Sequence, residues 1–327
     1  MDLFWAIVLF IAGLVCLIKG GDWFVDGATG LAHKAHLPEI LIGATVVSIG
    51  TTLPEVMVSA TGALSGSPAT AYGNAVGSVI CNTALIAAVT VAIRPAKVDR
   101  KTFSIPVAFF FSAAALFLLF SYVFGFFHRW MGIALLSLFV IYMTFTVWQA
   151  FRHKENAPPE KDEEENAGQN SPLWKSVLFL ILGAAIIALG AHLLVKHGTF
   201  IAEYFHVPQT VISLTFVALG TSLPELVTAI AALVKGHSAL SLGNIIGANL
   251  FNLVLVSGLA TTLAPFPLPA EKRIGPCNAS LAVDLPLMVL VMAILCVPAL
   301  LRNKLSRWQG VLLLVLYTAF LTFQFVF

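Results

Sequence analysis

The sequence carries very little charge for its length. Only 10% of its 327 residues are Asp, Glu, Lys or Arg, whereas 59% are hydrophobic, and the mean hydropathy is +0.93. A soluble domain of this size has about a quarter charged residues, so this composition cannot make a surface that faces water. We therefore expect the lipid bilayer to be the main partner of the chain. The net charge of +2 is too small to indicate nucleic acid as a partner.

The sequence also lacks the common motifs of enzymes, zinc sites and disulfide frameworks. Its four cysteines lie far apart, without a C-x-x-C pair: Cys16, Cys81, Cys277 and Cys296. The motifs H-E-x-x-H and G-x-S-x-G are absent, and no EF-hand spacing occurs. We expect the protein to be no enzyme and to hold no tightly bound cofactor.

Long apolar stretches dominate what is present. A helix needs about 20 apolar residues to cross a bilayer, and ten such stretches occur. They cover approximately residues 3–20, 38–64, 70–93, 103–123, 130–151, 174–195, 208–234, 238–263, 282–301 and 307–326. The first has no basic leader or small-residue cleavage signal, so we interpret it as a transmembrane helix rather than a signal peptide. These features predict an all-α integral membrane protein with about ten transmembrane helices.

One hydrophilic segment divides the chain into an N-terminal half, 1–152, and a C-terminal half, 173–327. This segment, 153–172, contains a run of four acidic residues and is interpreted as a linker. With both termini outside, 14 of the 18 Lys and Arg residues lie at the inner ends of the spans and 4 at the outer ends. Because positive residues favour the cytoplasm, we expect a multi-pass protein of the plasma (inner) membrane with a cytoplasmic linker.

The two halves contain an internal repeat. Residues 37–90 align without a gap to residues 207–260, at an offset of 170, with 16 identities in 54 positions. The first copy contains GTTLPE and GNAVGSVICN, and the second contains GTSLPE and GNIIGANLFN. Weaker matches at the same offset continue upstream, for example Gly13 with Gly183. Each half is therefore expected to be one repeat of about five helices.

Counting the spans gives the two copies opposite orientations. The second span runs from inside to outside, and its partner, the seventh, runs from outside to inside. Inverted repeats with broken helices near the bilayer midplane are typical of secondary transporters. Some channels also contain repeats, so a cation channel stays open as an alternative at this point.

Two glutamates, Glu55 and Glu225, are the only acidic residues deep inside the apolar spans. A carboxylate at the bilayer centre costs about 2.5–3.5 kcal/mol on insertion scales, so a compensating role is expected. The two occupy equivalent positions in the repeats, and no Lys or Arg lies at comparable depth. Facing carboxylates without a basic partner either share protons or bind cations.

The residues around each glutamate supply further oxygen atoms. Pro54 and Pro224 lack an N–H, and each disrupts the helical turn that begins four residues earlier, at Gly50 and Gly220. Backbone carbonyls near 48–51 and 218–221 can then turn toward a ligand, which membrane proteins tolerate only at a cavity or ion site. We therefore expect discontinuous helices at the centre of the molecule.

Polar side chains continue this pattern at helical spacing. Thr51, Glu55 and Ser59 lie four residues apart on one face, as do Thr221 and Glu225. In the paired helices, Asn74, Ser78 and Asn82 form one polar stripe, to which Asn244, Ala248 and Asn252 correspond. We interpret Asn82 and Asn252 as cation ligands. The G-x-x-x-G pairs Gly73/Gly77 and Gly243/Gly247 predict close helix packing.

The duplicated motifs resemble the α-repeats of the calcium/cation antiporter superfamily, and prokaryotic sodium/calcium exchangers in particular. The resemblance covers the whole chain. It implies alternating access, in which the first and sixth helices slide against the remaining core. It also implies a set of cation ligands: Glu55, Glu225, Thr51, Thr52, Thr221, Ser222, Ser78, Asn82, Asn252, and the backbone carbonyls of Ser48 and Ala218.

The chain departs from this family pattern at several positions. Many sodium/calcium exchangers have an aspartate where this chain has Asn252, and Ala248 replaces a usual serine. Two central carboxylates remain, and their charge would balance one Ca²⁺, two Na⁺ or two protons. We expect a monomeric exchanger of Ca²⁺ for Na⁺ whose exchange ratio is lower than that of relatives with a third carboxylate. A Ca²⁺/H⁺ antiporter is the nearest alternative.

Overall fold

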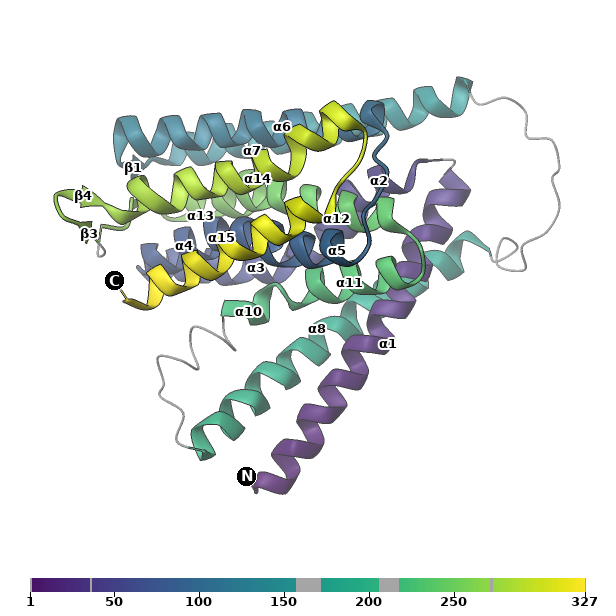
Figure 1. Ribbon diagram of the computed structural model, residues 1–327, viewed down its shortest axis with the longest axis horizontal. Helices are drawn as coiled ribbons and strands as arrows, with labels where there is room; N and C mark the ends of the chain where they lie inside the picture. The colour runs from purple at the N-terminus through teal and green to yellow at the C-terminus, as the bar shows by residue number, and fades with distance from the viewer. Residues whose placement is uncertain (1, 36, 157–171, 206–217, 271–272, 327) are drawn as a thin grey trace.

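The structure, a computed structural model, describes residues 2–35, 37–156, 172–205, 218–270 and 273–326, and most of them are helical (Figure 1). Most of the predicted linker and the first residues of the predicted second repeat, 207–217, lie outside the described residues. The α-helices of the N-terminal half are α1 (Leu3–Ala35), α2 (Glu39–Ile42), α3 (Ser48–Leu64), α4 (Pro68–Cys81), α5 (Ala88–Ile93), α6 (Arg100–Leu119) and α7 (Arg129–Asn156). Those of the C-terminal half are α8 (Leu173–Tyr204), α10 (Ala218–Thr221), α11 (Leu223–Val234), α12 (Ser238–Phe251), α13 (Ser257–Leu263), α14 (Leu285–Arg302) and α15 (Arg307–Val326).

Short π-helical segments interrupt or extend several of these helices. They are η1 (Gly43–Val47), η2 (Asn82–Ala87), η3 (Phe120–Phe124), η5 (Asn252–Val256) and η6 (Ser280–Asp284). Each π-helical turn adds a residue to the ordinary helical turn and shifts the side chains that follow it. Such turns are frequent at functional sites.

Eight segments of the described chain are long and apolar enough to cross a membrane. They are Leu3–Ala35, Glu39–Leu64, Ala69–Ile93, Arg100–Phe124, Arg129–Gln149, Leu173–Tyr204, Ser238–Leu263 and Ser280–Arg302. Eight of the predicted spans thus correspond to helices of membrane-crossing length. The seventh predicted span is described only from Ala218 onward, as α10 and α11, and the tenth corresponds to α15.

The helices α1 and α8 are much longer than the spans predicted there, 3–20 and 174–195. They contain 33 and 32 residues, and 33 residues at 1.5 Å each give about 50 Å, compared with a hydrocarbon core of about 30 Å. Figure 1 shows the two helices side by side, running obliquely to the others. The tilt lets both helices continue past polar residues that ended the predicted spans. Asp26, in the part of α1 beyond the predicted span, pairs at 2.7 Å with Lys235, which directly follows α11.

Glycines bring the backbones of α1 and α8 into direct contact. A Cβ atom added to Gly13 would lie 3.0 Å from the carbonyl oxygen of Gly190, and one added to Gly20 would lie 2.9 Å from the amide nitrogen of Ile187. In α8, an added Cβ at Gly183 would meet the backbone of Phe24. Small residues allow this close approach, which replaces the hydrophobic effect as a source of helix association in lipid.

The remaining helices form a bundle around α12. Of the segment Ser238–Leu263, 89% is buried inside the protein, whereas only 22% of α1 and 22% of α8 is buried. The bundle core contains large side chains from both halves, such as Phe103, Phe110, Tyr142 and Phe251, all fully buried. The helix α12 and the turn η5 that follows it therefore carry polar residues, including Asn244 and Asn252, at the centre of the protein and away from lipid.

Two short strand pairs modify the all-α prediction. Strand β1 (Phe126–Phe127) pairs antiparallel with β2 (Phe266–Pro267), and β3 (Arg273–Ile274) pairs with β4 (Cys277–Asn278). They lie in connections at one end of the bundle (Figure 1), where the backbone has left the helices and its N–H and C=O groups need new partners.

At the start of α6, Asp99 caps the helix. The hydrogen bond from the Thr102 hydroxyl, together with backbone N–H donors, keeps the pKa of Asp99 below its usual value.

Of the two predicted G-x-x-x-G pairs, the second packs as expected. A Cβ added to Gly243 would meet the backbone of Ile40, and one added to Gly247 would lie 2.6 Å from the Cα of Ala44. No described residue lies within 4 Å of a Cβ added to Gly73 or Gly77. At the repeat offset, the segment equivalent to 39–47 is 209–217, which lies outside the described residues, so close packing of the first pair stays a prediction.

The contact between α1 and α8 gives a prediction about stability. Gly190→Val should lower the melting temperature of the purified protein, because the new Cβ would lie 2.8 Å from the Gly13 carbonyl oxygen and 2.9 Å from the Leu17 amide nitrogen. Overpacking of this kind costs about 1–3 kcal/mol. The adjacent Leu189 is 52% exposed, so Leu189→Val is the control and should melt like the wild type. Equal melting temperatures for Gly190→Val and the wild type would contradict the described packing.

Candidate cation site

The structure places Glu55 on α3 and Glu225 on α11, both with no exposed surface. Their carboxylates lie close enough to interact electrostatically. The ion pairs among the described residues join Lys235 to Asp22 and Asp26, and His237 to Glu39, so none of them involves either glutamate. Two negative groups are therefore buried together with no basic side chain to compensate them, as the sequence predicted.

The helices that carry the two glutamates differ around the duplicated proline. In the second copy the helix is interrupted at Ser222, which has φ −89° and ψ 5° and separates α10 from α11. In the first copy, α3 runs from Ser48 to Leu64 through Pro54, and the irregular turn is η1, upstream of Ser48. The prediction of a discontinuity at Gly50 is therefore wrong for the first copy. There Pro54 removes one helical hydrogen bond, to the Gly50 carbonyl, without ending α3.

Two hydroxyl side chains accompany the carboxylates at equivalent positions, Thr52 and Ser222. They are buried, and neither hydroxyl oxygen has a hydrogen-bond partner among the described residues. The Glu225 carboxylate faces the hydroxyl groups of Thr51 and Thr52, although none of the described groups meets it with good hydrogen-bond geometry. These oxygens are therefore oriented toward one another without being satisfied.

Two asparagines complete the arrangement. Asn82 is the first residue of η2 and Asn252 is the first residue of η5, so the same backbone irregularity occurs at equivalent positions of the repeats. Both side chains are fully buried, and neither end of either amide has a partner among the described residues. The turn η2 contacts α11, which carries Glu225, and η5 contacts α3, which carries Glu55, so each amide lies on an element that packs against a glutamate helix.

Together these residues make three symmetry-related pairs: Thr52 with Ser222, Glu55 with Glu225, and Asn82 with Asn252. Other described side chains also have unpaired buried polar atoms, but none of those occurs as an equivalent pair. Buried polar groups are normally hydrogen-bonded, because an unpaired one costs about 1–3 kcal/mol. Carboxylate, hydroxyl and amide oxygens are ligands for hard cations such as Ca²⁺ and Na⁺, so a bound cation is the kind of partner that these unpaired oxygens fit.

The other predicted ligands lie around these pairs. The Ser48 hydroxyl donates to the Gly43 carbonyl at 2.7 Å, Ser78 is buried, and Thr51 and Thr221 donate to asparagine side chains. Ala218 is the first residue of α10, and its carbonyl was the predicted ligand. The described residues contain no cluster of three or more His, Cys, Asp or Glu side chains, in agreement with a centre that holds two carboxylates.

Asn74 and Asn244 contact the candidate site, which the sequence did not predict. The sequence placed them in polar stripes but did not identify them as parts of a cation site. In the structure, the side chain of each one accepts a hydrogen bond from a threonine of the other repeat. Their spacing of eight residues from Asn82 and Asn252 was the available signal, but helical spacing alone does not show which neighbour an amide contacts.

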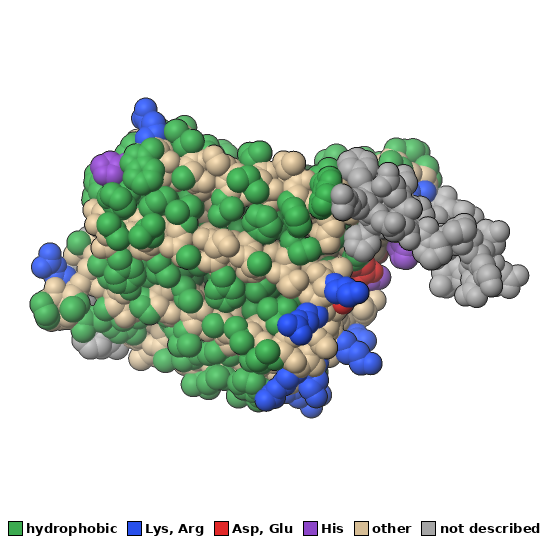
Figure 2. All heavy atoms as spheres, turned by 90° about the horizontal axis from the view of Figure 1, so that it is seen from above, with side chains coloured by type: hydrophobic (Ala, Val, Ile, Leu, Met, Phe, Trp, Pro, Cys, Tyr) green, Lys and Arg blue, Asp and Glu red, His purple; other side chains and the backbone are tan. Residues whose placement is uncertain are grey.

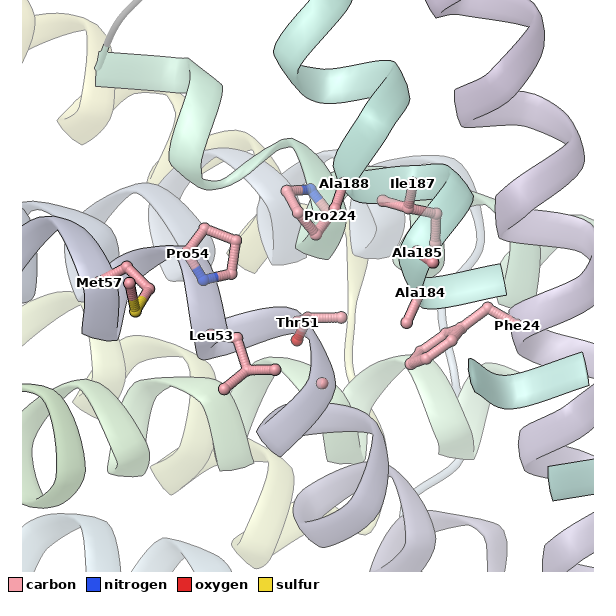
Figure 3. Close-up of a pocket in the computed structure, with 11 residues that line it drawn as sticks. Phe24, Thr51, Leu53, Pro54, Met57, Ala184, Ala185, Ile187, Ala188 and Pro224 are labelled. Carbon is pink, nitrogen blue, oxygen red and sulfur yellow. The ribbon is translucent and has the colours of Figure 1, made fainter. Parts of the chain in front are cut away.

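An apolar cavity of about 320 Å³ adjoins the site (Figure 3). It is lined by residues of α1, α3, α8 and α11, and Thr51 is the one polar side chain in its lining. Pro54 and Pro224 lie on one side of the cavity in Figure 3, and Phe24, Ala184 and Ile187 lie on the other. The cavity therefore lies between the two prolines and the part of the α1 and α8 pair that lines it.

Comparisons with known proteins agree with this geometry. A family model described as sodium/calcium exchanger protein matches residues 5–148 and 175–326. The chain is 33% identical to the putative antiporter CaxA of Alkalimonas amylolytica, over 98% of both chains. It is 31% identical to the sodium/calcium exchanger MaX1 of Methanosarcina acetivorans, over 97% of this chain and 98% of that one. A solved structure of the sodium-calcium exchanger NCX_Mj superposes with a TM-score of 0.78 at 31% identity, covering 97% of this chain and 98% of that one.

Proposed function

Because the chain belongs to the sodium/calcium exchanger family, and is thus a calcium/cation antiporter, we propose that it exchanges Ca²⁺ for Na⁺ across a membrane. The observation that carries this proposal is the set of three equivalent pairs of buried, unpaired oxygen-bearing side chains. At their centre the two carboxylates contribute a charge of −2. One Ca²⁺ or two Na⁺ balances this charge, so the two cargoes can replace each other at one site.

The proposed architecture is that of ten spans in two inverted five-helix repeats. Contacts between equivalent positions support it, since Thr51 meets Asn244 and Thr221 meets Asn74. We place both termini outside and the linker in the cytoplasm, in the plasma (inner) membrane. In Figure 2, most of the visible Lys and Arg side chains gather toward the end of the molecule where α7 and α8 adjoin the linker, as the positive-inside rule requires. The protein would act as a monomer without a resident cofactor.

Alternating access would use the α1 and α8 pair as the moving part. The two helices contact each other through backbone atoms along their length, so they are suited to move as a unit. The apolar cavity of about 320 Å³ lies between this pair and the proline turns, and it leaves room for such a displacement. Lys235, which directly follows α11 and contacts Asp22 and Asp26 of α1, would hold the pair in one of its positions.

Exchange of Ca²⁺ for protons is a second candidate, and the carboxylate pair itself favours it. Two adjacent acids without a basic partner can each take up a proton in place of a cation. Uptake of radioactive Ca²⁺ into vesicles separates the two candidates when an outward gradient of Na⁺ or of protons is imposed. We expect the Na⁺ gradient to drive uptake and a proton gradient alone to leave it near background.

Neutralising either central acid should abolish the exchange. We expect Glu55→Gln and Glu225→Gln each to lower Ca²⁺ uptake by about 100-fold or more, because losing one partner of a buried charge interaction costs about 3–5 kcal/mol. Both variants should melt at or above the wild-type temperature, since removing a buried charge lowers the cost of insertion. Glu203→Gln, which changes an exposed acid at the end of α8, is the control. Normal uptake by both central variants would rule out the proposed site.

The charge of the site also predicts how transport responds to voltage. With two carboxylates and a neutral Asn252, one Ca²⁺ should exchange for two monovalent cations, which moves no net charge. A fixed Na⁺ gradient should then drive Ca²⁺ uptake into reconstituted vesicles to the same extent when a membrane potential is imposed with K⁺ and valinomycin. A net current for each Ca²⁺ moved would contradict this balance.

A further inference from the structure

Two hydrogen bonds join the repeats reciprocally at the site. The Thr51 hydroxyl oxygen of the first repeat lies 3.2 Å from the Asn244 Oδ1 atom of the second. The Thr221 hydroxyl oxygen of the second repeat lies 3.4 Å from the Asn74 Oδ1 atom of the first. Thr51 and Thr221 are 170 residues apart, as are Asn74 and Asn244, so both bonds belong to one symmetric pattern.

The environment of Asn74 determines which end of its amide faces Thr221. The Asn74 Nδ2 atom lies 3.0 Å from the main-chain carbonyl oxygen of Glu55. A carbonyl oxygen can only accept, so the NH₂ group must point to it. The Oδ1 atom then faces Thr221, and the threonine hydroxyl must be the donor.

The same reasoning applies to Asn244 through a hydroxyl group. Its Nδ2 atom lies 2.9 Å from the Thr228 hydroxyl oxygen, and that hydroxyl donates its hydrogen to the Pro224 carbonyl at 2.8 Å. Thr228 can therefore only accept from the amide, which directs the Asn244 Oδ1 atom toward Thr51 and makes Thr51 the donor. The Ser48 hydroxyl oxygen also lies 3.2 Å from this atom, but its single hydrogen goes to the nearer Gly43 carbonyl at 2.7 Å.

The anchoring hydroxyl is present in both repeats although its position has shifted. In the first repeat it belongs to Ser59, which accepts from Asn74 at 2.8 Å. The position equivalent to Ser59 is Ala229, and the hydroxyl of the second repeat comes from Thr228, one residue earlier. The retained contact indicates that the orientation of the asparagine, rather than the residue at one position, is what both halves require.

This orientation decides what the threonines offer to a cation. A hydroxyl has one hydrogen, and it coordinates a cation through its oxygen lone pairs. A threonine that gives its hydrogen to an asparagine keeps these lone pairs available. Without the asparagine, the hydrogen of Thr51 would turn to the Glu225 carboxylate that it faces, and two potential ligands would then be occupied with each other.

We propose that Asn74 and Asn244 are positioning residues of the exchanger, each of which takes the hydroxyl hydrogen of the threonine in the opposite repeat and so directs its oxygen toward the transported cation. The inference rests on the proposed function, because it assigns a role at the same site. It adds two residues that do not themselves touch the cation, and it makes each half of the protein responsible for one ligand of the other half.

A double-mutant cycle between Asn244 and Thr51 tests this inference in the full-length protein. Asn244→Leu keeps the branched side-chain shape and the number of heavy atoms but removes the acceptor, and Thr51→Val removes the donor. Each variant should raise the Ca²⁺ concentration for half-maximal uptake about tenfold, since each loses one positioned interaction at the site, with a smaller change in the maximal rate. The double variant should be no worse than Thr51→Val alone, within about twofold, because the two residues act through one bond.

Asn249→Leu is the matched control. Asn249 lies on the same helix, is fully buried, and donates to Thr83 at 2.7 Å but to neither site threonine. Because Asn249 does not contact Thr51, the change in the half-maximal Ca²⁺ concentration for the double variant Asn249→Leu/Thr51→Val should equal the product of the two single fold-changes. If Asn244→Leu does not fold, the cycle of Asn74→Leu with Thr221→Val is measured in its place, with the same expectation.

Two results would overturn the inference. One is an unchanged half-maximal concentration in Asn244→Leu, and the other is an effect that multiplies with that of Thr51→Val. Stabilisation of the purified protein against heat by Ca²⁺ or Na⁺ measures binding without transport. If the wild type shows neither this stabilisation nor Ca²⁺ flux, the proposed function fails together with the inference. If the wild type binds and transports normally and the cycle is multiplicative, the inference alone fails.

Discussion

The structure is organised around two like charges that the protein must hold inside an apolar bundle. Glu55 and Glu225 are fully buried next to each other, and each would cost about 2.5–3.5 kcal/mol at the centre of a bilayer. Their mutual repulsion adds to this cost. Under the proposed function, a bound cation would offset both penalties at once, and the surrounding oxygen atoms without hydrogen-bond partners would be its further ligands.

The rest of the core can be understood as support for this centre. The helix α12 is the most buried segment of the protein, and glycines on it allow η1 and α2 to approach closely. The π-helical turns at Asn82 and Asn252 bring amide groups into the centre without breaking the helices apart. Asn74 and Asn244 then connect the two repeats. Under the proposal that these bonds orient the cation ligands, neither repeat could form the site alone.

The pair α1 and α8 is built differently from this core. Its helices are long, oblique and mostly exposed, and they contact each other through glycines (Figure 1). Apolar side chains such as Phe24 and Leu223 pack between the pair and the core, beside an apolar cavity and polar contacts such as that of Lys235 with Asp26. A rigid core and a separately packed pair are the two parts that alternating access requires. The division follows from where the glycines allow backbone contact and where an apolar gap remains.

The sequence by itself determined that most of the protein faces lipid, that the chain contains an internal repeat, and which acids lie at its centre. These depend on local composition, on a constant offset of 170 residues and on the cost of charge in lipid, all of which can be counted along the chain. The tertiary structure decided the length and tilt of α1 and α8, the continuity of α3 through Pro54, and the pairing of Thr51 with Asn244. Such features depend on which helices approach one another, and groups about 190 residues apart in the chain meet only when the two halves fold together.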